Sequence, residues 1–109
     1  MEKTLGKITG ISVGFGGYDD AMFGVSVSLG SGCWGVNDFK GTWGHDPDKH
    51  AKWTKAQQIR HFGETMKWLH NIMKQANVMR VADLKGVPVE ITTENNMLES
   101  WRILTEVIQ

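Results

Sequence analysis

The sequence has little cysteine and little proline. It contains one cysteine, Cys33, and two prolines among its 109 residues. A single cysteine cannot form an internal disulfide bond, which fits a protein of a reducing compartment. Catalysis by a thiol needs a basic neighbour, and none is close to Cys33 in the sequence. We therefore interpret Cys33 as a small buried or half-buried residue of a strand.

An excess of charge and a long apolar run are also lacking. Twelve basic and twelve acidic side chains give a formal net charge of zero. Nucleic acid is therefore not an expected partner, because binding through phosphates depends on a basic excess. No apolar run reaches the length of a membrane span, and the first residues lack the apolar segment of a signal peptide. We expect a cytoplasmic protein that does not contact a membrane.

Glycine and tryptophan, by contrast, are abundant. Eleven of the thirteen glycines lie in the first 44 residues, and five tryptophans are many for this length. Because tryptophan is enriched at interfaces, we expect some of the five on a contact surface. The length and the 40% hydrophobic content predict a single domain over residues 1–109.

The first third of the chain has the pattern of three antiparallel strands. Val25, Val27 and Leu29 alternate with glycine and serine, a period of two that predicts one apolar and one nearly bare face. Glycine-rich turns separate this segment from its neighbours. The sequence therefore predicts a meander of strands at residues 5–15, 23–29 and 33–42.

A long amphipathic helix follows a polar loop. Thr54 and Gln57 have the spacing of a capping box, and the helix is expected to run to about residue 76. The stripe expected to face the sheet recurs at spacings of three and four and consists of Ile59, Phe62, Met66, Leu69, Met73 and Ala76. A second apolar flank, His61, Trp68 and Ile72, packs under a loop or contacts a partner or a second copy of the chain.

Two further strands are expected at residues 87–93 and 98–108. The last one carries large apolar side chains on both faces, so we expect it to be central or to have one face covered. The resulting order is β-β-β-α-β-β. The simplest architecture is an α+β fold, an antiparallel sheet of about five strands with one long amphipathic helix packed across one face.

Catalytic motifs are weak in this sequence. His45, Asp46, Asp48 and His50 could ligate a metal, but a second element would have to add ligands, and a solvated turn is the preferred interpretation. No serine–histidine–acid or cysteine–histidine arrangement can be assembled. We therefore expect a binding protein without a cofactor rather than an enzyme, and a metal-dependent enzyme using these four residues is the lesser alternative.

The candidate binding surface combines exposed aromatic and acidic side chains. Such aromatic residues dominate the energy of many protein interfaces. The adjacent aspartates also suit a turn, which is an alternative role for them. The residues assigned to this surface are Tyr18, Asp19, Asp20, Trp34, Asp38 and Trp43.

Two segments resemble a group of small proteins encoded by phages and prophages. They are residues 14–43, with the core GFGGYDDAMFGVSVSLG, and residues 87–108, VPVEITTENNMLESWRILTEVI. The resemblance implies an accessory protein that binds and blocks a host macromolecule, such as an anti-CRISPR or other anti-defence protein. The alternative is a protein that sequesters a nucleotide or another small molecule, at a homodimer interface for example.

Overall fold

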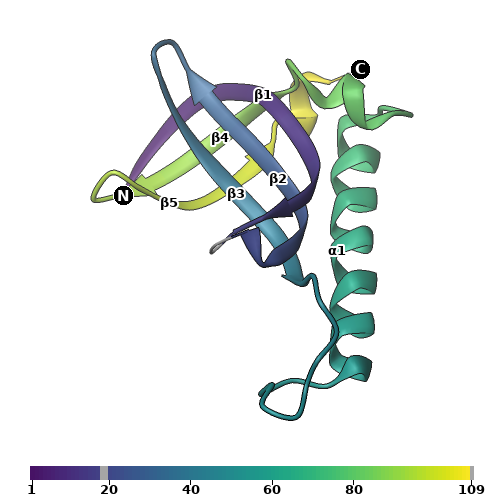
Figure 1. The fold of residues 1–109 in the computed structure, drawn as a ribbon. Coiled ribbons are helices and arrows are strands. Elements are labelled where there is room, and N and C mark those ends of the chain that lie inside the picture. Colours follow the sequence, from purple (N-terminus) through teal and green to yellow (C-terminus); the bar gives the residue numbers. More distant parts are fainter. Residues whose placement is uncertain (18–19, 109) are drawn as a thin grey trace.

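The computed structural model describes residues 1–17 and 20–108, and it confirms the α+β fold (Figure 1). The order along the chain is β-β-β-α-β-β, with one long helix beside a five-stranded antiparallel sheet. The elements are β1 Glu2–Gly16, β2 Met22–Ser31, β3 Trp34–Trp43, α1 Lys55–Ala76, the 3₁₀ helix η2 Val81–Leu84, β4 Pro88–Glu94, β5 Met97–Ile103 and the 3₁₀ helix η3 Thr105–Val107.

The sheet is organised around its longest strand, β1. The strand order is β3-β2-β1-β4-β5, so β1 is central and the expected meander of the first three strands is confirmed. The first half of β1 pairs with β4, whereas its second half pairs with β2. The register shifts between Ile8 and Gly10, which leaves Thr9 as an extra residue. Such a bulge bends a strand and increases its twist.

The bend in β1 brings the two edges of the sheet towards each other. Trp101 on β5 donates its indole N–H to the Oδ2 atom of Asp38 on β3, at 2.7 Å. In Figure 1, β4 and β5 pass behind the β2–β3 hairpin. Because β4 returns by a long connection to lie beside β1, the order β3-β2-β1-β4 is a Greek key. The sheet is therefore a partly open, five-stranded Greek-key barrel.

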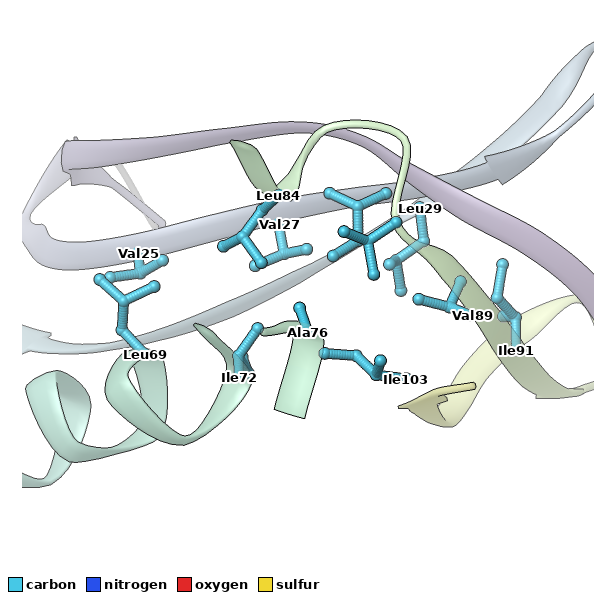
Figure 2. Packing of buried hydrophobic residues seen from close by; sticks show 12 residues of the cluster. Val25, Val27, Leu29, Leu69, Ile72, Ala76, Leu84, Val89, Ile91 and Ile103 are labelled. Atoms are coloured by element: carbon cyan, nitrogen blue, oxygen red, sulfur yellow. The ribbon is translucent and has the colours of Figure 1, made fainter. Parts of the chain in front are cut away.

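The core fills the barrel and the contact between the barrel and the C-terminal half of α1 (Figure 2). The alternating residues Val25, Val27 and Leu29 are almost completely buried, as the period of two predicted. Burial of each such side chain contributes about 1.5–3 kcal/mol. The other buried hydrophobic residues are Ile8, Leu69, Ile72, Ala76, Leu84, Val87, Val89, Ile91 and Ile103.

The limits of α1 follow from its capping residues. The Thr54 hydroxyl accepts from the Gln57 amide at 3.1 Å, and the Gln57 side chain accepts from the Thr54 amide at 2.8 Å, which confirms the capping box. At the other end, Asn77 adopts a left-handed conformation with φ of 57°. Asparagine tolerates this conformation, which closes the helix. Among the described residues, no helix has the length and apolar character needed to span a membrane.

The predicted sheet-facing stripe of α1 is wrong over residues 59–66, the first half of the helix and its midpoint. Ile59, Phe62 and Met66 are exposed, whereas Gln58 and Thr65 are buried. The buried face is thus rotated towards the flank that includes Ile72 and Trp68. The physical reason is that the barrel contacts α1 mainly near its C-terminal half, while the N-terminal half and the preceding loop project beyond the end of β3 (Figure 1).

Two smaller expectations were also wrong. The fifth strand is an edge strand rather than a central one, so the second alternative applies and one of its faces is covered; the strand ends at Ile103 instead of Ile108. Its apolar residues have different neighbours, because Ile103 enters the core while Trp101 packs edge-on against Trp68 of α1, with ring centroids 6.4 Å apart. Cys33 is exposed in the turn between β2 and β3, since the strand begins one residue later than expected.

Candidate functional site

The residues predicted as one binding surface are spread over the molecule. Trp34 and Trp43 are the first and last residues of β3, so they lie roughly 30 Å apart along the strand. Being nine residues apart, they also point to opposite faces of a regular strand. Tyr18 and Asp19 lie outside the described residues, and Asp20 is exposed with φ of 53°. The structure therefore separates Trp34 from Trp43, whereas Asp20 lies two residues before Met22, the residue of β2 that pairs with Trp43.

Asp38 and Trp34 have separate environments. Asp38 accepts the hydrogen bond from Trp101 that links the two edges of the barrel, which is a structural contact. Trp34 lines a cavity of about 380 Å³ at the end of the barrel next to the β4–β5 turn, together with Thr4, Val36 and Asn96 among others. This cavity is open and its walls are mixed in polarity.

The flank predicted as a partner interface lies against the barrel of its own chain. Ile72 belongs to the core and is 6% exposed, and Trp68 packs on Trp101. The His61 ring is half-buried, with its Nδ1 atom 3.5 Å from the hydroxyl of Thr42 on β3. Ile72 is therefore not available to a partner, because the rotation of α1 turns this flank towards the sheet.

An exposed apolar surface lies where α1 diverges from the sheet. We call it the apolar wedge, and its residues are Val13 and Phe15 of β1, Phe23 of β2, and Ile59, Phe62 and Met66 of α1. Phe15 is 65% exposed and Met66 is 63% exposed. Phe23 joins the two sides, since its ring centroid lies 5.1 Å from that of Phe15 and 6.2 Å from that of Phe62, both edge-on.

The wedge continues the core beyond the point where the helix covers it. In the β1–β2 register, Val13 pairs with Val25 and Phe15 pairs with Phe23, so these side chains share the face of the core residues. Figure 2 shows Leu69 of α1 pointing towards Val25. Further towards the N-terminus of α1, a pocket of about 220 Å³ opens between α1 and the strands β1 and β2. Its lining is almost entirely apolar.

Sequence reasoning missed the wedge because it assigned the stripe of Ile59, Phe62 and Met66 to the sheet. The feature of the sequence that could have indicated the wedge is the total width of the apolar surface on α1. This width exceeds what one contact with a sheet requires. Both the stripe and the flank are apolar, and only one of them can face the barrel at any level of the helix. The pattern alone does not indicate which one does.

The histidine- and aspartate-containing loop does not assemble a metal site among the described residues. Asp46 forms an ion pair with Lys55, and the Asp48 carboxylate accepts from the His50 amide at 2.8 Å. His45 instead lies edge-on to two tryptophan rings. Asp46 and His45 thus contact residues outside the candidate set, and Asp48 forms a local turn with the backbone of His50.

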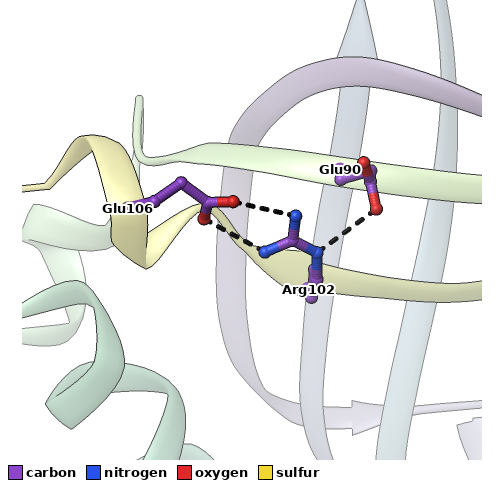
Figure 3. A network of polar contacts seen from close by, with 3 residues as sticks. All are labelled: Glu90, Arg102 and Glu106. Atoms are coloured by element: carbon purple, nitrogen blue, oxygen red, sulfur yellow. Dashed lines mark hydrogen bonds and ion pairs between the residues drawn. The ribbon is translucent and has the colours of Figure 1, made fainter.

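Strong ion pairs lie on the surface near the C-terminus (Figure 3). Arg102 donates to both carboxylate oxygens of Glu106, at 3.1 and 3.0 Å, and to Glu90 at 3.2 Å. These hydrogen bonds lower the pKa of Glu106 and raise the pKa of Arg102 from their ordinary values. The hydrogen bond from Lys55 likewise lowers the pKa of Asp46. These shifts hold the groups in their charged forms, as in structural ion pairs rather than in acid–base catalysts.

Partly open five-stranded Greek-key barrels bind oligonucleotides or oligosaccharides in other proteins, through the outer face of the second and third strands. In this protein that face is nearly bare, with Ser26, Ser28, Asn37 and Phe39 pointing outward by the register of β2 and β3. Among the described residues it presents no basic side chain that could neutralise phosphates. The architecture alone therefore assigns no ligand.

Comparisons of the chain with models of protein families, with curated proteins and with solved structures find no significant match.

Proposed function

We propose that this protein acts by non-catalytic binding of another protein, and that the apolar wedge is the contact surface. The observation that carries this proposal is the amount of apolar surface left in water. With aromatic and large aliphatic side chains of about 150–250 Å² each, the exposed fractions of the wedge residues amount to roughly 500 Å². Contiguous patches of this size on soluble proteins are often interaction sites.

The size of the wedge matches one side of a specific protein interface. A standard interface buries about 800 Å² on each partner, and roughly 65% of its central part is apolar. The wedge therefore supplies most of the apolar area that one partner needs. Its pocket of about 220 Å³ is suited to an anchoring apolar side chain, which is how interface hot spots are built.

The residues of the wedge are all apolar, so apolar contact rather than net charge would select the partner. The occupant that fits best is a protein segment with two or three apolar anchors at helical spacing. The resemblance to phage-encoded proteins makes a host protein the partner that we propose.

A photo-crosslinking amino acid at position 66 tests this proposal in host cells. Position 79 is the matched control, because Met79 is also an exposed methionine, 91% accessible, and lies outside the wedge. We expect one defined protein to crosslink from position 66 and not from position 79. The purified pair should then bind, and Met66→Glu should weaken binding by at least about 30-fold, a central hot-spot effect, while Met79→Glu does not.

Three results would contradict the proposal. The same proteins could crosslink from positions 66 and 79, or Met66→Glu and Met79→Glu could have equal affinity for the purified partner. The third is a crosslink from position 66 only to a second copy of this chain, with a dimer mass in solution. That result would assign the wedge to self-association instead.

A further inference from the structure

The loop between β3 and α1, residues 44–54, forms a second surface, and its first residue, Gly44, lies against Phe15 and Phe23 of the apolar wedge. Its path is fixed by Gln58, whose amide nitrogen donates to the backbone carbonyls of Trp43 at 2.6 Å and His45 at 2.9 Å. Gln58 is only 2% exposed. Because two carbonyls accept from its NH₂ group, the orientation of the amide is determined, and Oε1 faces away from them.

The Oε1 atom of Gln58 is buried and has no hydrogen-bond partner among the described residues. Buried polar atoms are almost always paired in folded proteins, because leaving one unpaired costs free energy. A donor from outside the chain, either an ordered water molecule or a ligand group, would complete this acceptor.

Aromatic rings stand beside this acceptor. Trp43 and Trp53, at the two ends of the loop, stack with an interplanar angle of 12° and ring centroids 6.1 Å apart. The His45 ring lies edge-on to both, at 6.1 and 5.5 Å. Trp43 remains 36% exposed, so part of this aromatic surface is accessible.

A pocket of about 270 Å³ lies beside these aromatic rings, and Gln58 is one of the residues that line it. Its walls are mainly apolar, and they come from β2, β3, the loop and the first turns of α1. The residues are Met22, Gly41, Thr42, Trp43, Trp53, Gln58 and His61. Its volume lies just below the usual range for small-molecule sites, so it suits one ring system rather than a large ligand.

We propose that this pocket binds a neutral, planar heteroaromatic ring that carries an N–H donor, which is the chemistry of a nucleobase. The indoles offer a stacking surface that any base can use. The Oε1 atom of Gln58 accepts the N–H, which satisfies its missing hydrogen bond. This site does not depend on the protein-binding role of the wedge. It would give the chain a second activity, the binding of a free nucleobase or of a base within a strand.

Nuclear magnetic resonance with a panel of nucleosides tests the proposal directly. The indole N–H signals are assigned with Trp43→Phe, Trp53→Phe and Trp34→Phe, the last being the control at the far end of β3. We expect one of adenosine, guanosine, cytidine and uridine to shift the Trp43, Trp53 and Gln58 side-chain signals saturably, at concentrations up to roughly 10 mM. The Trp34 signal should stay in place. An oligonucleotide of the same base then shows whether the base is bound free or on a strand.

Two variants and one ligand analogue separate binding from folding. Trp53→Ala should reduce affinity by about 10-fold or more while the signals of the barrel core stay unchanged, and Trp34→Ala should not. An analogue of the bound nucleoside that has no N–H group on its base should also bind about 10-fold more weakly than the nucleoside itself. The reason is that the Oε1 atom of Gln58 then stays unpaired. Absence of saturable shifts, shifts away from this pocket, or equal binding of the donor-free analogue would overturn the proposal.

Discussion

The two halves of α1 have the same kind of sequence and opposite environments. In the C-terminal half, Leu69 and Ile72 are buried against the barrel, whereas Ile59 in the N-terminal half and Met66 at the middle of the helix are exposed. Both halves carry apolar residues at spacings of three and four. A hydrophobic stripe therefore identifies side chains that are suited to burial. Whether they are buried within the same chain depends on the path of the neighbouring strands.

The largest effect should come from truncations at a buried and at an exposed position of α1. Leu69→Ala removes a buried side chain and leaves a cavity in the core, so we expect a loss of about 2–5 kcal/mol in the free energy of unfolding. Met66→Ala removes an exposed side chain and should change stability by no more than about 0.5 kcal/mol. Urea denaturation of both variants measures this contrast. Equal losses would mean that the wedge is packed in solution.

A medium effect is expected at the start of the exposed half. Thr54→Ala removes the hydroxyl that accepts from the Gln57 amide, and loss of such a cap costs about 1 kcal/mol. Thr54→Ser keeps the acceptor and is the matched control, with stability close to that of the wild type. Hydrogen exchange should show faster opening of the first helical turn in Thr54→Ala only. Unchanged hydrogen exchange in the first turn of Thr54→Ala would show that the hydrogen bonds of Gln58 to the loop are sufficient to stabilise this end of the helix.

A smaller effect of opposite sign is expected at Gly63, between the two halves. A Cβ atom added there would have nothing within 4 Å, and glycine in a helix interior is less stable than alanine by about 0.5–1 kcal/mol. Gly63→Ala should therefore raise stability by that amount in thermal or urea unfolding. Gly41→Ala is the contrasting control, because its Cβ would clash with the Phe23 carbonyl oxygen. A destabilised Gly63→Ala would indicate that the helix bends there.

Local features of the fold could be predicted from the sequence, because they depend on residues close in the chain. The capping box of Thr54 and Gln57 gave the start of α1, and the alternation around Val27 gave the buried face of β2. The barrel could not be predicted, because the pairing of β1 with β4 and the Trp101–Asp38 contact join distant segments.

The candidate sites were harder to predict for the same reason. The wedge depends on where α1 leaves the sheet, which no periodicity encodes. Gln58 is a polar residue of a helix and would be expected in water by composition alone. It is buried because the loop brings the carbonyls of Trp43 and His45 to its amide. Both features follow from the tertiary path of the loop rather than from the local pattern.

The smallest expected effect compares the ion pairs at the two ends of the molecule. Arg102 lowers the pKa of Glu106 from its ordinary value of 4.5, and Lys55 lowers that of Asp46 from 3.8. A carboxylate with a lowered pKa contributes stability above its ordinary value and loses it as pH falls through the folded-state value. Glu106→Gln should therefore flatten the decrease in melting temperature between about pH 6 and pH 3. Asp46→Asn should flatten it less, since Arg102 holds Glu106 through two hydrogen bonds and Lys55 holds Asp46 through one. Parallel pH curves for Glu106→Gln and the wild type would show that the Arg102 contacts are too solvated to affect stability.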